Sequence, residues 1–170
     1  MKSDKKRRTL ELSFRDAFIG IWDCIKSERN MRIHITATAY LLFFAANMGL
    51  ARGEFALLFL AVAAVITAET FNTAFEEICD FIKSDFDKVI GKIKDICAGA
   101  VLVSSIFAVC VGAVLMVRME FFHVITMIFT TPLYAVLFVL SLILAVIFII
   151  AGPMGMAGFL KPKANKQVKK

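Results

Sequence analysis

Apolar residues recur at helical spacing in segment 10–25, near the start of the chain. One helical face of this segment carries Leu10, Phe14, Phe18 and Trp22. Ala17, Ile21 and Ile25 lie on the same face, whereas charged residues elsewhere, such as Arg15, Asp16, Asp23 and Lys26, make the segment too polar to cross a membrane. The pattern is typical of an amphipathic helix that lies in the membrane interface, with its Trp at the level of the headgroups. We therefore predict an N-terminal surface helix.

Four further apolar segments follow, and we interpret each as a membrane span. They cover residues 33–48, 55–82, 96–117 and 133–150. A helix of about 20 residues crosses the hydrocarbon core of a bilayer. The first segment is the shortest and contains His34 and Asn47, whereas the last follows Pro132, which is a helix-start signal. We interpret the stretch before Pro132, with His123, as a loop.

The composition supports a membrane protein. Hydrophobic residues make up 59% of the 170 residues, and 17 residues are Phe. The mean hydropathy is +0.78. A soluble domain of this size could not bury so much apolar surface, so we predict an all-α membrane protein. The four Cys residues show neither metal-ligand spacing nor a disulfide framework.

The distribution of charge predicts the orientation of the chain. The net charge is +6, and the basic residues gather at both ends and in the loop 83–94. This arrangement suits anionic headgroups, and we expect no nucleic-acid partner. The loops on the other side hold only Arg52 and Arg118 as basic residues. The positive-inside rule therefore places both termini and the loop 83–94 in the cytoplasm.

A stripe of polar residues lies at the end of the second predicted span. It consists of Glu69, Asn72, Thr73, Glu76 and Asp80. At about 100° per residue these positions share one face of a helix. Burying a single carboxylate at bilayer depth costs roughly 2.5 kcal/mol or more. The stripe therefore indicates a functional site at the cytoplasmic edge of the membrane.

Other polar residues at the same membrane face could complete a site for phosphoryl transfer. They are Glu28 before the first span, Asp85 and Asp87 in the loop, and Lys94 and Asp95 before the third span. Phosphoryl transfer needs metal ligands, a cation that holds the phosphates, and a base near the acceptor hydroxyl. The sequence contains no Gly-rich phosphate loop and no protein kinase motif. A nucleotide site in this chain would therefore be unconventional.

Three segments in this order resemble a known family. Residues 28–34 read ERNMRIH, residues 68–76 read AETFNTAFE, and residues 94–101 read KDICAGAV. They resemble the small bacterial diacylglycerol kinase/undecaprenol kinase family, and the resemblance covers about residues 13–117. It implies a homotrimeric enzyme of the bacterial cell membrane, with a surface helix and three spans per subunit. Such an enzyme moves the γ-phosphate of ATP, with Mg²⁺ as cofactor, to a lipid alcohol.

The resemblance also implies roles for single residues. Glu69 matches the base that accepts the proton of the lipid hydroxyl, and Glu28 and Glu76 match the carboxylates that bind Mg²⁺. The residues that match nucleotide-binding positions are Glu28, Glu76, Asp85, Phe86, Asp87, Lys94 and Asp95. Asn72 and Asp80 match residues that complete the active site. Family members usually carry His at the position of Asp87.

The resemblance also divides the chain and suggests an acceptor. We interpret residues 1–12 as a basic tail, 13–118 as the lipid kinase domain, and 119–170 as an additional span with a basic tail. The segments 28–34 and 72–74 are closer to the Gram-positive branch, which implies undecaprenol as the acceptor. Diacylglycerol is the alternative acceptor. A transporter or channel subunit, which would also hold carboxylates among its helices, is the alternative of another class.

Overall fold

The chain is helical throughout the part that the structure describes. The computed structural model describes residues 10–82 and 87–160, with side chains up to residue 155, and these residues form six helices without a strand. The helices are α1 (Leu10–Ser27), α2 (Arg29–Asn47), α3 (Arg52–Ile82), α4 (Lys88–Met116), α5 (Met119–Thr130) and α6 (Pro132–Leu160). The all-α membrane fold predicted from the sequence is confirmed.

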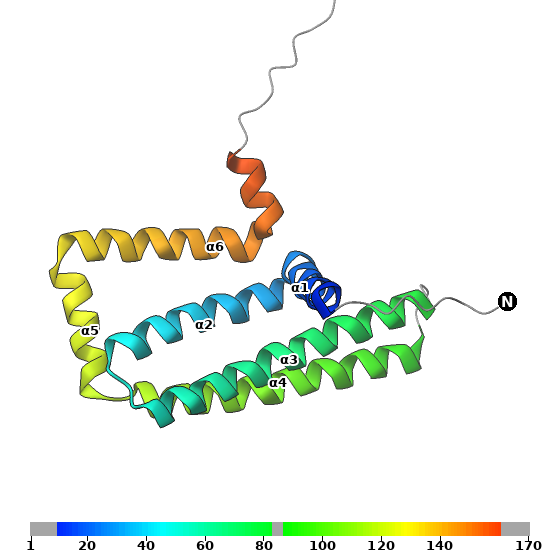
Figure 1. Ribbon diagram of the computed structural model, residues 1–170, viewed down its shortest axis with the longest axis horizontal. Helices are drawn as coiled ribbons and strands as arrows, with labels where there is room; N and C mark the ends of the chain where they lie inside the picture. Colours follow the sequence, from blue (N-terminus) through cyan, green and yellow to red (C-terminus); the bar gives the residue numbers. More distant parts are fainter. Residues whose placement is uncertain (1–9, 83–86, 161–170) are drawn as a thin grey trace, which may run out of the picture.

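The antiparallel pair α3 and α4 is the longest packed unit of the molecule. The two helices run side by side over most of their length, and α2 runs alongside them from α1 toward the end of the bundle at α5 (Figure 1). Helix α1 contacts α2, α3 and α6. It is amphipathic, as the sequence predicts, and none of its residues is fully buried.

Among the described helices, three are long and apolar enough to cross a membrane. They are Arg52–Ile82, Lys88–Met116 and Pro132–Gly155. Three of the four predicted spans therefore correspond to such helices. The predicted span 33–48 falls in α2, which has 19 residues but carries polar residues along much of its length.

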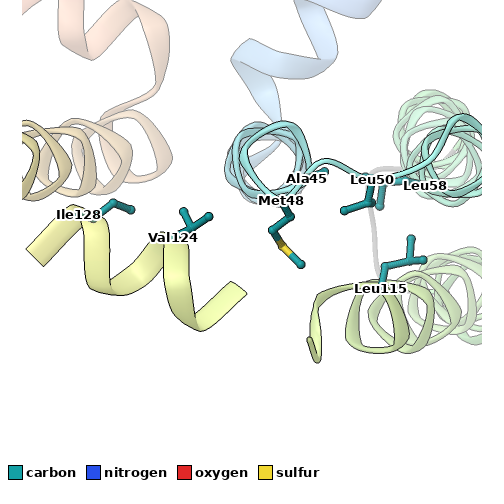
Figure 2. Close-up of a cluster of buried hydrophobic side chains, with 7 residues drawn as sticks. All are labelled: Ala45, Met48, Leu50, Leu58, Leu115, Val124 and Ile128. Atoms are coloured by element: carbon teal, nitrogen blue, oxygen red, sulfur yellow. The ribbon is translucent and has the colours of Figure 1, made fainter. Parts of the chain in front are cut away.

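A hydrophobic cluster joins the helices at the end of the bundle where α2 turns into α3. Its buried residues are Ala45, Met48, Leu50, Leu58, Leu115, Val124 and Ile128. Met48 points from the end of α2 between α4 and α5 (Figure 2). Gly49 adopts a positive φ of 68° in the tight turn after α2, a conformation that glycine adopts without strain. Because lipid is as apolar as these side chains, the cluster stabilises the bundle through close packing rather than through burial from water.

Helix α5 corrects one expectation from the sequence. The stretch with His123 was expected to be a loop, but residues 119–130 form a helix of 12 residues. It connects the far ends of α4 and α6 (Figure 1). Val124 and Ile128 lie one turn apart and both enter the hydrophobic cluster, which explains why the stretch is helical. At the same end of the bundle, Arg118 forms an ion pair with Glu54 at the start of α3.

Helix α6 packs against α2 and is broken near its end. The Tyr40 hydroxyl and the Ser141 hydroxyl lie 3.0 Å apart and share a hydrogen bond between α2 and α6. Gly152 has a φ of 65°, Pro153 follows it, and the rest of the helix turns away from the bundle (Figure 1). An apolar groove of about 760 Å³ lies between α2, α5 and α6, and none of the predicted site residues lines it.

Candidate active site

Glu28 occupies the junction between α1 and α2. Its backbone is extended, with φ −96° and ψ 120°, and its amide donates a hydrogen bond of 2.9 Å to the carbonyl of Cys24. Glu28 is the N-cap residue of α2, yet its side chain makes no capping hydrogen bond. The half-buried carboxylate is therefore available to a ligand instead of serving the helix end.

Glu69 is the most deeply buried acidic residue of the described chain. Only 1% of its surface is exposed, and neither carboxylate oxygen has a hydrogen-bond partner among the described residues. Glu28 and Glu76 lie close enough to repel its charge. Burying an unpaired carboxylate is costly unless a proton or a cation satisfies it. The arrangement therefore suits proton transfer or cation binding rather than structural support.

Asn72 and Thr73 lie next to Glu69, about one turn further along α3. Asn72 is 5% exposed and donates a hydrogen bond of 2.9 Å from Nδ2 to Oε1 of Glu76, while its own Oδ1 is buried and has no partner in the described part of the chain. The Thr73 hydroxyl donates to the backbone carbonyl of Glu69 at 3.0 Å. The two bonds fix the helical face that carries the acidic stripe and leave an unsatisfied acceptor beside Glu69.

The surface helix closes one side of this region. Cys24 on α1 lies near the side chain of Thr73 where α1 contacts α3. Burial raises the pKa of the Cys24 thiol above its ordinary value, and the nearby Thr73 side chain opposes this effect in part. Helix α1 thus contacts α3 one turn beyond Glu69, which brings the junction with Glu28 to the acidic stripe.

Lys94 links α4 to the outer end of the stripe. Its Nζ lies 2.5 Å from Oδ1 of Asp80, and the ammonium also attracts the carboxylate of Glu76. The Asp80 side chain is 67% exposed and the Lys94 side chain 33%. Exposed ion pairs contribute little to stability, so a phosphate could replace Asp80 as the partner of Lys94. Asp95 follows Lys94 and is exposed.

The loop between α3 and α4 accounts for the remaining predicted residues. Asp85 and Phe86 lie outside the described residues. Asp87 is the N-cap residue of α4, and its carboxylate accepts a hydrogen bond of 2.8 Å from the amide of Val89. The structure therefore brings Glu28, Asn72 and Glu76 to Glu69, and Lys94 and Asp80 to the edge of the same cluster.

Arg32 is the residue of this region to which sequence analysis assigned no role. It is 7% exposed and belongs to the segment 28–34 that carries the family resemblance. Arg32 lies one residue before the predicted span 33–48, so no charge inside a predicted span singled it out, and only the folded structure shows that it is buried.

The family of the chain follows from comparison with known proteins. The model of the family described as prokaryotic diacylglycerol kinase matches residues 15–116. The chain belongs to this family. It is a membrane-located lipid kinase, and the family implies that it uses ATP. The resemblance predicted from the three sequence segments is confirmed, and the match ends at the last residue of α4.

Two curated relatives of this lipid kinase carry different names. The chain is 31% identical over 100 residues to the undecaprenol kinase of Bacillus subtilis, a match that covers 59% of this chain and 81% of that protein. It is 35% identical over 108 residues to the diacylglycerol kinase of Synechocystis, covering 63% of this chain and 62% of that protein. No solved structure matches the chain.

Proposed function

We propose that this lipid kinase phosphorylates undecaprenol with the γ-phosphate of ATP. The observation that carries the proposal is the buried, unpartnered carboxylate of Glu69 beside Glu28 and Glu76, near the end of a membrane-length helix. The relative in Bacillus subtilis, which is named undecaprenol kinase, supports the choice of acceptor.

Glu69 acts as the general base in this proposal. One of its oxygens accepts the proton of the lipid hydroxyl as the hydroxyl oxygen forms a bond to the γ-phosphorus. The bond between the γ-phosphorus and the bridging oxygen breaks, and ADP leaves with the electron pair. Glu69 suits this role because its oxygens make no hydrogen bond to the described protein, so both are free to accept a proton.

Glu28 and Glu76 hold Mg²⁺ in this proposal. No group of three or more His, Cys, Asp and Glu side chains forms a metal site within the described residues. Mg²⁺ bound to a nucleotide usually takes one or two carboxylates together with phosphate oxygens and waters, so a pair of carboxylates fits. When bound, Mg²⁺ neutralises charge on the phosphates. Asn72 also favours a metal site beside Glu76. Its Nδ2 donates to Glu76, and its Oδ1 has no partner among the described residues.

Lys94 binds the phosphates in this proposal. Its ammonium already attracts two carboxylates, Asp80 and Glu76, and a nucleotide phosphate is a stronger anionic partner. Asp80 then holds Lys94 in place while no nucleotide is bound. We extend nucleotide contact to Asp85, Phe86, Asp87 and Asp95, which stand at the matching positions of the family.

The proposal includes the cellular context. We place the protein in the bacterial cell membrane as a homotrimer, with both termini in the cytoplasm and residues 13–118 as its kinase domain. Most of the apolar surface of the long helices is exposed in a single chain, which agrees with contact to lipid and to neighbouring subunits. Basic residues at both ends of the chain favour the cytoplasmic side.

A direct competition between acceptors tests the proposed function. Purified protein receives labelled ATP and equal amounts of undecaprenol and diacylglycerol in the same micelles, and the labelled lipids are then separated. We expect most label in undecaprenyl phosphate. Preferential labelling of phosphatidic acid would favour diacylglycerol, which the name of the Synechocystis relative makes the second candidate. Because the chain belongs to a lipid kinase family, the transporter alternative loses its support.

A further inference from the structure

Arg32 is buried, and within the described residues its guanidinium donates to three backbone carbonyls and forms no ion pair with a carboxylate. Its Nε donates to the carbonyl of Ile149 at 3.1 Å. Its Nη1 donates to the carbonyls of Ile25 at 3.1 Å and of Lys26 at 2.9 Å. One guanidinium therefore joins three parts of the chain, namely the end of α1, the first turn of α2 and the broken part of α6.

The carbonyl of Ile149 is available because of the proline in α6. In an α-helix the amide of residue 153 would donate to the carbonyl of residue 149. Pro153 has no amide hydrogen, and the positive φ of Gly152 interrupts the helix at the same point. The carbonyl of Ile149 loses its helical donor, and Nε of Arg32 takes that place.

Gly152 also makes room for the guanidinium. A Cβ atom at this position would lie 3.4 Å from Nη1 and 3.5 Å from Cζ of Arg32, and the φ of 65° disfavours any residue with a side chain. Gly152 and Pro153 therefore act together. Gly152 leaves space for the guanidinium, and Pro153 leaves the carbonyl of Ile149 free to accept its hydrogen bond.

The carbonyls of Ile25 and Lys26 belong to the last turn of α1. Carbonyls at the end of a helix have no partner within the helix and carry partial negative charge, so a buried cation stabilises them. Glu28 lies between these carbonyls and Arg32 in the sequence. Fixing both sides of the junction fixes the backbone from which the Glu28 carboxylate projects.

We infer that the break at Gly152–Pro153 is a docking site for Arg32, and that α6 positions Glu28 through this contact. Helix α6 lies outside the segment 15–116 matched by the family model, so in this scheme a helix beyond the matched segment supports the active site. Arg32 is a positioning residue in this scheme. The effect on Mg²⁺ rests on the role proposed for Glu28, whereas the docking itself does not.

The variant Pro153→Ala tests the docking in the full-length protein. It supplies an amide that competes with Arg32 for the carbonyl of Ile149, and alanine is tolerated in a helix. Pro132→Ala is the matched control, because Pro132 stands at the first position of the same helix, where a missing amide breaks no helical bond. The first readout is the rate at which a maleimide labels Cys24, followed by mass spectrometry of its peptide.

We expect Pro153→Ala to raise the labelling rate of Cys24 about tenfold, since loss of a charge-assisted bond loosens the end of α1. Arg32→Lys should raise it similarly, and the double variant should be no faster than Arg32→Lys alone. If Pro153→Ala is labelled no faster than the control Pro132→Ala, the docking is overturned. It is also overturned if the effects of Pro153→Ala and Arg32→Lys multiply in the double variant.

The Mg²⁺ concentration that gives half-maximal rate is the second readout. We expect Pro153→Ala to raise it about tenfold, as loss of an outer partner of a metal ligand does. If Glu28→Gln shifts this concentration and Pro153→Ala does not, the positioning of Glu28 is refuted. If Glu28→Gln itself causes no shift, the proposed metal role fails, and the Cys24 labelling still decides the docking.

Discussion

Asn72 donates a hydrogen bond of 2.9 Å from Nδ2 to Oε1 of Glu76, one turn further along α3. Asn72 is almost fully buried, whereas Glu76 reaches the half-exposed edge of the site. The bond orients the Glu76 carboxylate through Oε1, and Oε2 takes no part in it. If Glu76 binds Mg²⁺ as proposed, Asn72 has the place of the outer partners that orient metal ligands in other proteins.

Replacement of Asn72 should therefore weaken the response to Mg²⁺. In Asn72→Ala, we expect the Mg²⁺ concentration for half-maximal rate to rise about tenfold, since Glu76 loses its partner. Thr70→Ala is the control, because the Thr70 hydroxyl donates to the backbone carbonyl of Ile66 in its own helix. The measurement is the initial rate of lipid phosphorylation against Mg²⁺ at fixed ATP. An unchanged curve for Asn72→Ala would separate Asn72 from the metal site.

Glu28 and Glu76 should each be needed for the metal response. Glu28→Gln and Glu76→Gln keep the size of the side chain but remove its charge. We expect each to raise the required Mg²⁺ by about tenfold or more and to lower the rate, with helix content by circular dichroism unchanged. Glu11→Gln on the exposed start of α1 is the control. Normal Mg²⁺ curves for both variants would refute the assignment.

Lys94 should act mainly on ATP. We expect Lys94→Ala to raise the KM for ATP about tenfold with a smaller change in kcat, since it removes the cation that we propose binds the phosphates. Lys92→Ala, an exposed lysine on the same helix, should leave KM unchanged. Asp80→Asn should leave KM unchanged or lower it, because it removes the anion that competes for Lys94. A fall in kcat alone for Lys94→Ala would contradict this role.

Glu69→Gln should stop turnover without preventing nucleotide binding. The glutamine keeps the shape of the buried side chain and removes its basic oxygen, so we expect kcat to fall by roughly a hundredfold or more. Binding of a fluorescent ATP analogue should persist, because Lys94, Glu28 and Glu76 are unchanged. Glu77→Gln, an exposed neighbour on α3, is the control. Near-normal phosphorylation of undecaprenol by Glu69→Gln would place the base elsewhere.

Both ends of the chain should face the cytoplasm. A single cysteine placed at Lys170 should react with a membrane-impermeant maleimide only after the cells are opened, whereas one placed at Arg52 should react in intact cells. Labelling of the Lys170 position in intact cells would show that the orientation, or the number of crossings, differs from the prediction.

Periodicity and charge in the sequence determined the class of fold and the face that carries the acidic stripe. The spacing from Glu69 to Asp80 follows directly from the helical repeat, which is a local property of the backbone. The membrane-length apolar segments likewise identify α3, α4 and α6 without knowledge of their packing. The segments 28–34, 68–76 and 94–101 were enough to identify the family, which the match over residues 15–116 confirms.

Contacts between distant parts of the chain were decided only by the tertiary structure. The helix at residues 119–130 is short, and its packing against the end of α2 becomes visible only once the bundle is assembled. Arg32 and Ile149 lie 117 positions apart, and their hydrogen bond depends on a carbonyl that Pro153 leaves free. A local pattern specifies which groups lack partners along one helix, but only the folded chain determines which distant side chain satisfies them.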